Sequence, residues 1–249
     1  MVLNRLIILR HAESRENKRH RVQGLDDPEL QRGYKKLTED LTDRIVEGER
    51  LIRYSGQVYV FSSGMKRSYY TAQWMHSHLA NRYKIQADLL RRPDLNERGQ
   101  GVLEGLSYEK VVEYLLREKL PPGTTLEPKA KSIYPHLFSS DVIPGGEKLE
   151  RAKSRLERFA VEELQQREGI GFIVGHSISG MNYLDNLLTS GNILGDGNYK
   201  HFPNLTGVRL EIESFGRYRE TGRYEPQNRD WSHANGAQVT PPLERVVGT

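Results

Sequence analysis

Short apolar runs alternate with longer amphipathic stretches along this chain. The apolar runs have the length of buried strands and lie at residues 3–9, 57–61, 83–89, 170–174 and 206–212. The amphipathic stretches have helical periodicity and lie at about residues 34–54, 65–82, 108–119, 147–167 and 179–188. Strands that alternate with helices in this way predict a mostly parallel sheet between two layers of helices. We therefore expect an α/β fold, a three-layer sandwich with a mostly parallel central sheet, helices on both faces and an antiparallel edge strand.

Three segments depart from this alternation. Residues 206–212 and 217–224, joined through a turn at 214–216, predict a hairpin at the antiparallel edge. Residues 120–146 contain five prolines and are expected to form an irregular insertion, a kind of segment that is usually a functional lid or disordered. We expect one domain over residues 1–225, and a loosely ordered C-terminal tail over residues 226–249.

Composition narrows the class of protein. No apolar run approaches the roughly 20 residues of a membrane span, so no membrane partner is expected. The chain has no cysteine, which excludes a thiolate nucleophile and fits a cytoplasmic location. The net charge is +4 and the pI is near 9.1, but basic residues are interspersed with acidic ones, as on solvated helix faces. Nucleic-acid binding is therefore not expected.

Candidate functional side chains follow three of the predicted strands. Arg10 and His11 end the first strand, and His176 ends the strand at 170–174. The strand at 57–61 leads through two serines into a helix with Arg67 on its opening turn. Ligands of such sheets bind beyond the carboxyl ends of the strands. We therefore expect two imidazoles and two guanidiniums to meet at one rim of the sheet.

This set of residues has the chemistry of a phosphoryl pocket. A guanidinium group can donate two hydrogen bonds to the oxygens of one phosphate, and it stays charged at any working pH. A neutral imidazole can attack phosphorus, and a second imidazole can donate hydrogen bonds to phosphoryl oxygens. A proton donor for the leaving alkoxide is still required, and the candidates are Asp94, Glu97 and Glu104. The histidines have no metal-ligand spacing with carboxylates, so we expect no metal and no cofactor.

The segment LRHAESREN resembles the signature of the histidine phosphatase superfamily, also called the phosphoglycerate mutase-like family. The resemblance extends over roughly residues 6–212, with the motifs in the family's order. It implies that His11 is phosphorylated, that Glu97 protonates the leaving group, and that Arg10, Arg67 and His176 complete the catalytic set. It also implies phosphate or substrate contacts for Asn17 and Gln23, and we add Ser177 and Glu104 as candidate substrate contacts. Two departures are Ala12, where relatives usually have glycine, and residues 177–179, where many relatives have glycines.

Within the family, the main alternatives are a phosphatase and a mutase. The mutase branch resembles ERHYGGLTG after the acid, whereas this chain has Gly99 and Gln100 in place of His-Tyr, and a carboxylate at Glu104. A carboxylate there would repel an anionic mutase substrate, so we favour a phosphatase. The expected activity is metal-independent hydrolysis of a small phosphorylated metabolite through a phosphohistidine intermediate on His11. A mutase-type phosphoryl transfer and a phosphoprotein phosphatase stay as alternatives, and a homodimer is compatible with the sequence.

Overall fold

The computed structural model describes residues 3–138, 141, 143–195, 199–214 and 217–224, so the tail predicted at 226–249 lies outside the described residues. One mixed sheet runs through this part of the chain. Its strands are β1 (Leu3–Arg10), β2 (Val58–Ser62), β3 (Asp88–Arg91), β4 (Gly169–Gly175), β5 (Gly207–Ser214) and β6 (Arg217–Tyr224). The spatial order is β3-β2-β4-β1-β5-β6. The first four strands pair in parallel, and β5 and β6 form an antiparallel hairpin at one edge.

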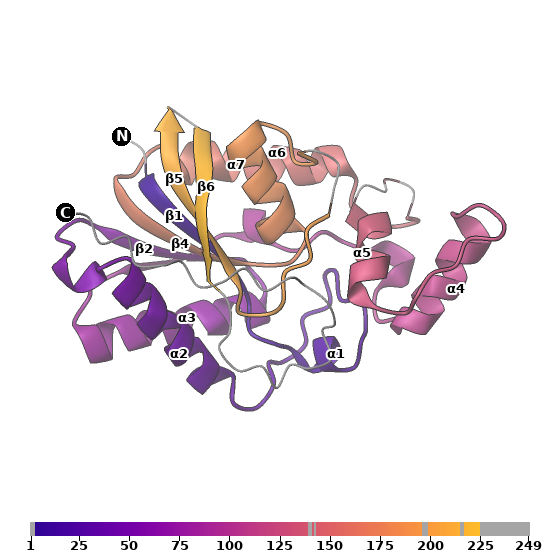
Figure 1. Ribbon diagram of the computed structural model, residues 1–249, viewed down its shortest axis with the longest axis horizontal. Helices are drawn as coiled ribbons and strands as arrows, with labels where there is room; N and C mark the ends of the chain where they lie inside the picture. Colours follow the sequence, from indigo (N-terminus) through magenta and orange to yellow (C-terminus); the bar gives the residue numbers. More distant parts are fainter. Residues whose placement is uncertain (1–2, 139–140, 142, 196–198, 215–216, 225–249) are drawn as a thin grey trace, which may run out of the picture.

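Helices cover both faces of this sheet (Figure 1). They are α1 (Arg15–Lys18), α2 (Tyr34–Gly48), α3 (Lys66–Tyr83), α4 (Tyr108–Glu118), α5 (Ala130–Phe138), α6 (Leu149–Phe159) and α7 (Asp185–Ser190). The helices α2 and α3 lie on one face, and α6 and α7 lie on the other (Figure 1). The predicted α/β sandwich is therefore confirmed. None of the helices in the described part of the chain is long and apolar enough to cross a membrane.

The sequence of β1 shows why both faces are covered. Leu6 and Ile8 point into a core with α6, whereas Ile7 and Leu9 point into a second core with α2 and α3. All four side chains are buried. Because side chains alternate along a strand, an uninterrupted apolar run needs apolar partners on each side. The parallel register then pairs Arg10 with Gly175 and brings the ends of β1 and β4 to the same rim.

The boundary between α3 and β3 differs from the predicted strand at 83–89. The helix continues to Tyr83, and β3 begins only at Asp88. Lys84 ends the helix in the left-handed conformation, with its backbone N–H bonded to the carbonyls of Leu79 and Ala80. Tyr83 therefore belongs to the last helical turn, although its neighbours Ile85 and Ala87 suggested an earlier strand.

The proline-rich insertion contains a helix, α5, where irregular structure was expected. Its buried residues Ile133, Tyr134, Leu137 and Phe138 lie on one apolar face. Pro135 lies inside the helix. A proline at an interior position normally argues against a helix, because it removes a backbone hydrogen bond. Packing of the apolar face against the main core overrides that local preference here.

Candidate active site

A pocket of about 310 Å³ lies beyond the carboxyl ends of the parallel strands. It is lined by Arg10, His11, Asn17, Gln23, Gly24, Arg67, Glu97, Gln100, Tyr134, Ser177 and Ile178. These residues come from the loops after β1, β3 and β4, from the first turn of α3, and from α5 in the insertion. The fold thus brings together side chains that are far apart in sequence.

His11 follows β1 and is held in one tautomer. Its Nδ1 lies 2.7 Å from the carbonyl oxygen of Ala12, which can only accept, so Nδ1 carries the proton and Nε2 keeps its lone pair. Burial lowers the pKa of His11 well below its usual value, and the charges of Arg67 and Arg10 lower it further. His11 is therefore a neutral imidazole with a free basic nitrogen at neutral pH.

The neighbouring residues fix the backbone at this position. Asn204 donates a hydrogen bond of 2.9 Å to the carbonyl oxygen of His11. The N–H of Ala12 donates to the hydroxyl of Thr71 at 3.1 Å, and the methyl group of Ala12 is fully buried in the core beneath. Ala12, which stands where relatives usually have glycine, therefore packs its methyl group in the core, and its N–H donates to Thr71. Arg10 donates from Nη1 to the carbonyl of Phe202 and leaves its buried Nε without a partner in the described part of the chain.

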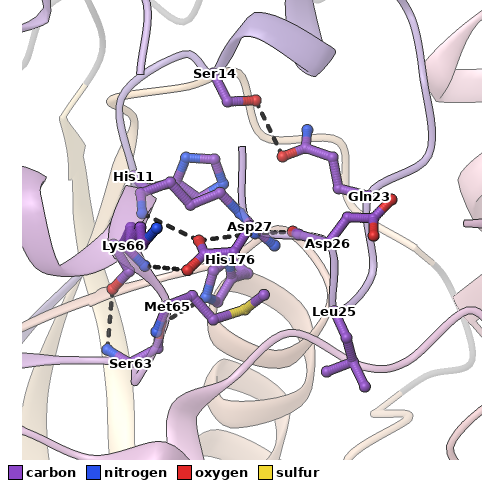
Figure 2. A network of polar contacts seen from close by, with 12 residues as sticks. His11, Ser14, Gln23, Leu25, Asp26, Asp27, Ser63, Met65, Lys66 and His176 are labelled. Carbon is purple, nitrogen blue, oxygen red and sulfur yellow. Dashed lines mark hydrogen bonds and ion pairs between the residues drawn. The ribbon is translucent and has the colours of Figure 1, made fainter. Parts of the chain in front are cut away.

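His176 ends β4 and faces His11, with the two ring centroids 5.1 Å apart and the rings at 61°. Its Nε2 lies 2.8 Å from the hydroxyl of Ser63, an interaction drawn in Figure 2. Its Nδ1 is buried and has no partner among the described residues. Burial lowers the pKa of His176 well below its usual value, with the charge of Arg67 as the next cause. Both imidazoles are therefore neutral, and His176 lies beside His11 without being one of the residues that line the pocket.

Arg67 lies on the first turn of α3 and is only 1% exposed. Its Nη2 donates to the carbonyl of Gly24 at 2.9 Å, and its Nη1 donates to the carbonyl of Asp26. The Nε is buried without a partner in the residues that the structure describes. Burial lowers the pKa of Arg67 to about 10, while the nearby carboxylates Glu97 and Asp27 raise it. The guanidinium is therefore still cationic at neutral pH.

Asp27 holds the start of α3, as Figure 2 shows. Its carboxylate accepts the backbone N–H of Lys66 at 2.7 Å and that of Arg67 at 3.4 Å. It also lies 3.6 Å from Nη1 of Arg67. Sequence reasoning missed this residue, because no local pattern indicates that an acid 39 positions earlier caps this helix.

Glu97 lines the pocket and is bound by three backbone N–H groups. Oε1 accepts from Arg98 and Ser179, each at 2.9 Å, and Oε2 accepts from Ile178 at 3.2 Å. The segment at 177–179, where relatives have glycines, therefore positions this carboxylate through its main chain. The hydroxyl of Ser177 does not contact Glu97; it lies 2.6 Å from the hydroxyl of Tyr199.

Asn17 and Gln23 also lie in the pocket wall, as the resemblance implies. Both are joined to Ser14. Its hydroxyl donates to Oε1 of Gln23 at 3.0 Å (Figure 2), and its backbone N–H donates to Oδ1 of Asn17 at 3.1 Å. The small helix α1 and the loop at 22–27 are thus connected by one polar network.

Two of the three candidate acids lie outside the pocket wall. The carboxylate of Glu104 accepts the backbone N–H groups of Leu25 and Gln100 at 3.0 and 2.7 Å, so it joins two loops behind the pocket. The carboxylate of Asp94 pairs with Arg158 on α6. Only Glu97 of the three lines the pocket.

Four wall residues were not among the predicted site residues, namely Gly24, Gln100, Tyr134 and Ile178. Tyr134 lies in the proline-rich insertion, where no helix was expected. Gln100 was noted only as a difference from the mutase pattern. The described residues include no group of three or more histidine and carboxylate side chains that could hold a metal ion.

Comparison with known proteins agrees with this geometry. Residues 6–214 match the histidine phosphatase superfamily (branch 1). The chain therefore belongs to this superfamily, as its sequence motifs predicted.

Individual relatives are distant. The chain is 26% identical over 211 residues to a 2,3-bisphosphoglycerate-dependent phosphoglycerate mutase of Buchnera aphidicola, covering 76% of this chain and 87% of the relative. It is 24% identical over 151 residues to phosphoglycerate mutase-like protein 4 of Arabidopsis thaliana, covering 60% of this chain but only 56% of that relative.

Solved structures share the fold at low sequence identity. One is a candidate alpha-ribazole-5'-P phosphatase from Escherichia coli, with a TM-score of 0.63 and 17% identity over 90% of this chain and 97% of that one. Another is a mycobacterial glucosyl-3-phosphoglycerate phosphatase in complex with VO3, with a TM-score of 0.60 and 19% identity over 88% and 97% of the two chains. At this level of identity, the likeness concerns the fold.

Proposed function

We propose that this protein is a metal-independent phosphatase that hydrolyses a small phosphate monoester through a phosphohistidine on His11. The observation that carries the proposal is the state of His11. Its Nδ1–H is fixed on the carbonyl of Ala12, and its neutral Nε2 belongs to a pocket with two buried guanidiniums. Three buried nitrogens without a partner among the described residues are donors suited to an anionic phosphoryl group, namely Nε of Arg10, Nε of Arg67 and Nδ1 of His176.

The reaction has two steps. Nε2 of His11 forms a bond to phosphorus while the ester P–O bond breaks, and Glu97 gives its proton to the leaving alkoxide. Water then attacks the phosphohistidine, the N–P bond breaks, and the carboxylate of Glu97 takes the proton from water. Three backbone N–H groups hold the carboxyl group of Glu97 at this position in the pocket wall.

Arg98 supplies no charge to the described lining of the pocket. Its guanidinium is buried, and it donates to the carbonyl of Glu147 at 2.8 Å, to that of Leu137 at 2.9 Å and to the hydroxyl of Tyr183 at 3.0 Å. Arg98 is shared with the mutase pattern, but here its donors point into the structure. The resemblance to the Buchnera mutase keeps phosphoryl transfer between positions of phosphoglycerate as the second candidate.

The cover that α5 forms over the pocket supports a small substrate. Tyr134 of this helix is buried and forms part of the wall. We therefore propose a phosphorylated metabolite as substrate in preference to a phosphoprotein. A cytoplasmic location and the absence of a cofactor belong to the same proposal.

The test is to trap the intermediate. Purified protein, freed of metals with chelator, is mixed with ³²P-labelled substrate and quenched without acid. Wild type should give an acid-labile, base-stable phosphoenzyme, and His11→Ala should give none and no turnover. His76→Ala, which replaces a half-buried histidine of α3 outside the pocket wall, is the matched control and should label normally. Isomerisation of phosphoglycerate without phosphate release would instead support the mutase, and labelling of His11→Ala would refute the mechanism.

A further inference from the structure

Gln100 carries a buried hydrogen-bond acceptor that has no partner in the described part of the chain. The residue lines the pocket and is 1% exposed, and its Oε1 makes no hydrogen bond with any described residue. Its Nε2 donates to the carbonyl of Arg98 at 3.1 Å. Because a carbonyl only accepts, this contact fixes the orientation of the amide and leaves Oε1 as the free atom.

The backbone keeps this side chain in place. The N–H of Gln100 donates to Oε1 of Glu104 at 2.7 Å. Gln100 also forms an isolated antiparallel β-bridge with Gly146, the last residue of the insertion. Oε1 therefore cannot reach bulk water by a small movement of the loop. A buried polar atom without a partner is costly, and such atoms normally serve a ligand or a water molecule.

The charges of the pocket limit what that ligand can be. The cationic side chains of its described lining are Arg10 and Arg67, since both imidazoles are neutral. Both guanidiniums are suited to a phosphate dianion. The other polar wall residues are neutral amides and hydroxyls, namely Asn17, Gln23, Gln100, Tyr134 and Ser177. A second anionic group on the substrate would therefore find no further cation in the described lining.

We propose that Gln100 is a specificity residue whose Oε1 accepts a hydrogen bond from a hydroxyl of the substrate. The preferred substrates are then phosphate monoesters of neutral polyols or sugars, and esters with a second anionic group are disfavoured. This inference rests on the proposed phosphatase activity. It adds the chemical nature of the organic part to a site that otherwise specifies only phosphate.

The experiment compares matched substrates that differ in hydroxyl groups. Glycerol 3-phosphate is paired with propyl phosphate, and ribose 5-phosphate is paired with tetrahydrofurfuryl phosphate, which has the ring but no hydroxyls. For each pair, kcat/KM is measured for wild type, for Gln100→Met and for Val102→Ala. Methionine has a similar length and shape but no acceptor oxygen. Val102 is a nearby exposed residue outside the pocket wall and provides the matched control.

The ratio within a pair is the readout, because any general damage to the pocket cancels. Wild type and Val102→Ala should prefer the hydroxylated partner of at least one pair by about tenfold or more, the value of one good hydrogen bond. Gln100→Met should reduce that ratio to within about twofold of unity. Wild type should also hydrolyse glycerol 3-phosphate faster than 3-phosphoglycerate, which carries a carboxylate in place of the CH₂OH group.

Three results would overturn the inference while leaving the proposed function intact. One is His11-dependent hydrolysis with no hydroxyl preference in either pair. The second is a preference that Gln100→Met leaves unchanged, and the third is a higher rate with 3-phosphoglycerate than with glycerol 3-phosphate. If p-nitrophenyl phosphate and all four esters are left intact by wild type, the proposed function itself fails.

Discussion

The hydroxyl of Ser63 lies 2.8 Å from Nε2 of His176 and accepts the backbone N–H of Met65 at 3.2 Å. With Met65 as its donor, Ser63 has its own proton free for Nε2 of His176. That arrangement places the single N–H proton of the neutral His176 ring on Nδ1, the buried atom that has no partner among the described residues. Ser63 therefore sets the tautomer in which His176 can donate to a phosphoryl oxygen.

Ser63→Ala should lower kcat/KM by about tenfold, because His176 then lacks a group that favours the Nδ1–H tautomer. The measurement is steady-state hydrolysis, together with a thermal melt to confirm folding. Ser154→Ala, on the exposed side of α6, is the control and should behave as wild type. Unchanged kinetics in Ser63→Ala would show that the hydroxyl of Ser63 does not determine the tautomer of His176.

Glu97→Gln should separate substrates by their leaving groups. Loss of a general acid usually costs about 10²–10⁴-fold, and the loss should be large for an alkyl phosphate, whose alkoxide leaves badly. It should be at least about tenfold smaller for p-nitrophenyl phosphate, whose phenolate leaves unaided. Glu104→Gln is the comparison variant, since that carboxylate joins loops behind the pocket. Equal losses for both substrates with Glu97→Gln would remove it from the role of acid.

The rate should persist at mildly acidic pH. Because the folded pKa of His11 is well below its usual 6.5, the imidazole stays unprotonated and nucleophilic as the pH falls through 6.5. The acid limb of kcat/KM should therefore have an apparent pKa below 6.5 after correction for the ionisation of the substrate. Replacing one of the two cations, as in Arg67→Gln, should move this limb upward, since Arg67 is the largest charge effect on His11. An acid limb above 6.5 in wild type would contradict the assignment of His11 as a neutral nucleophile.

Asp185→Asn should stabilise the protein above pH 6. Asp185 is 1% exposed, its carboxylate oxygens have no hydrogen-bond partner among the described residues, and Lys200 Nζ is 3.7 Å away. Burial raises its pKa to about 6, so the folded state binds more protons than the unfolded state between about pH 4 and 6. The carboxylate therefore destabilises the fold above pH 6, and this penalty is relieved as the pH falls.

The gain from Asp185→Asn should accordingly be larger at pH 8 than at pH 4.5, by on the order of 2 kcal/mol. Chemical denaturation at the two pH values measures it, and the difference between variant and wild type cancels the titration of the other groups. A gain that is the same at both values would show that the carboxylate is stably ionised in the fold. The rate of hydrolysis should be unaffected, because Asp185 lies outside the pocket wall.

The central residues of the site could be predicted because each follows a recognisable element. Arg10, His11 and His176 end buried strands, and Arg67 opens a helix, so the topology of a parallel sheet alone places them at one rim. Asp94, Glu97 and Glu104 lie in one short segment, and residue type alone does not show which of the three is the proton donor. The choice among them depends on which carboxylate faces the pocket, and this is decided by the N–H groups of residues 178 and 179, about 80 positions further along the chain.

The residues that sequence reasoning missed are placed by long-range packing. Tyr134 reaches the pocket only because α5 folds despite Pro135, and Asp27 matters only because its loop crosses the start of α3. Glu104 was expected near the substrate, but the backbone N–H groups of two loops satisfy its carboxylate. None of these contacts leaves a periodic or local signal in the sequence.

The buried guanidinium of Arg98 connects the pocket carboxylate to the pocket wall. Arg98 follows Glu97 in the chain and donates hydrogen bonds to the carbonyls of Leu137 and Phe138 at the end of α5. Tyr134 of the same helix lines the pocket. One buried side chain therefore fixes the position of the Glu97 backbone relative to the wall that α5 contributes.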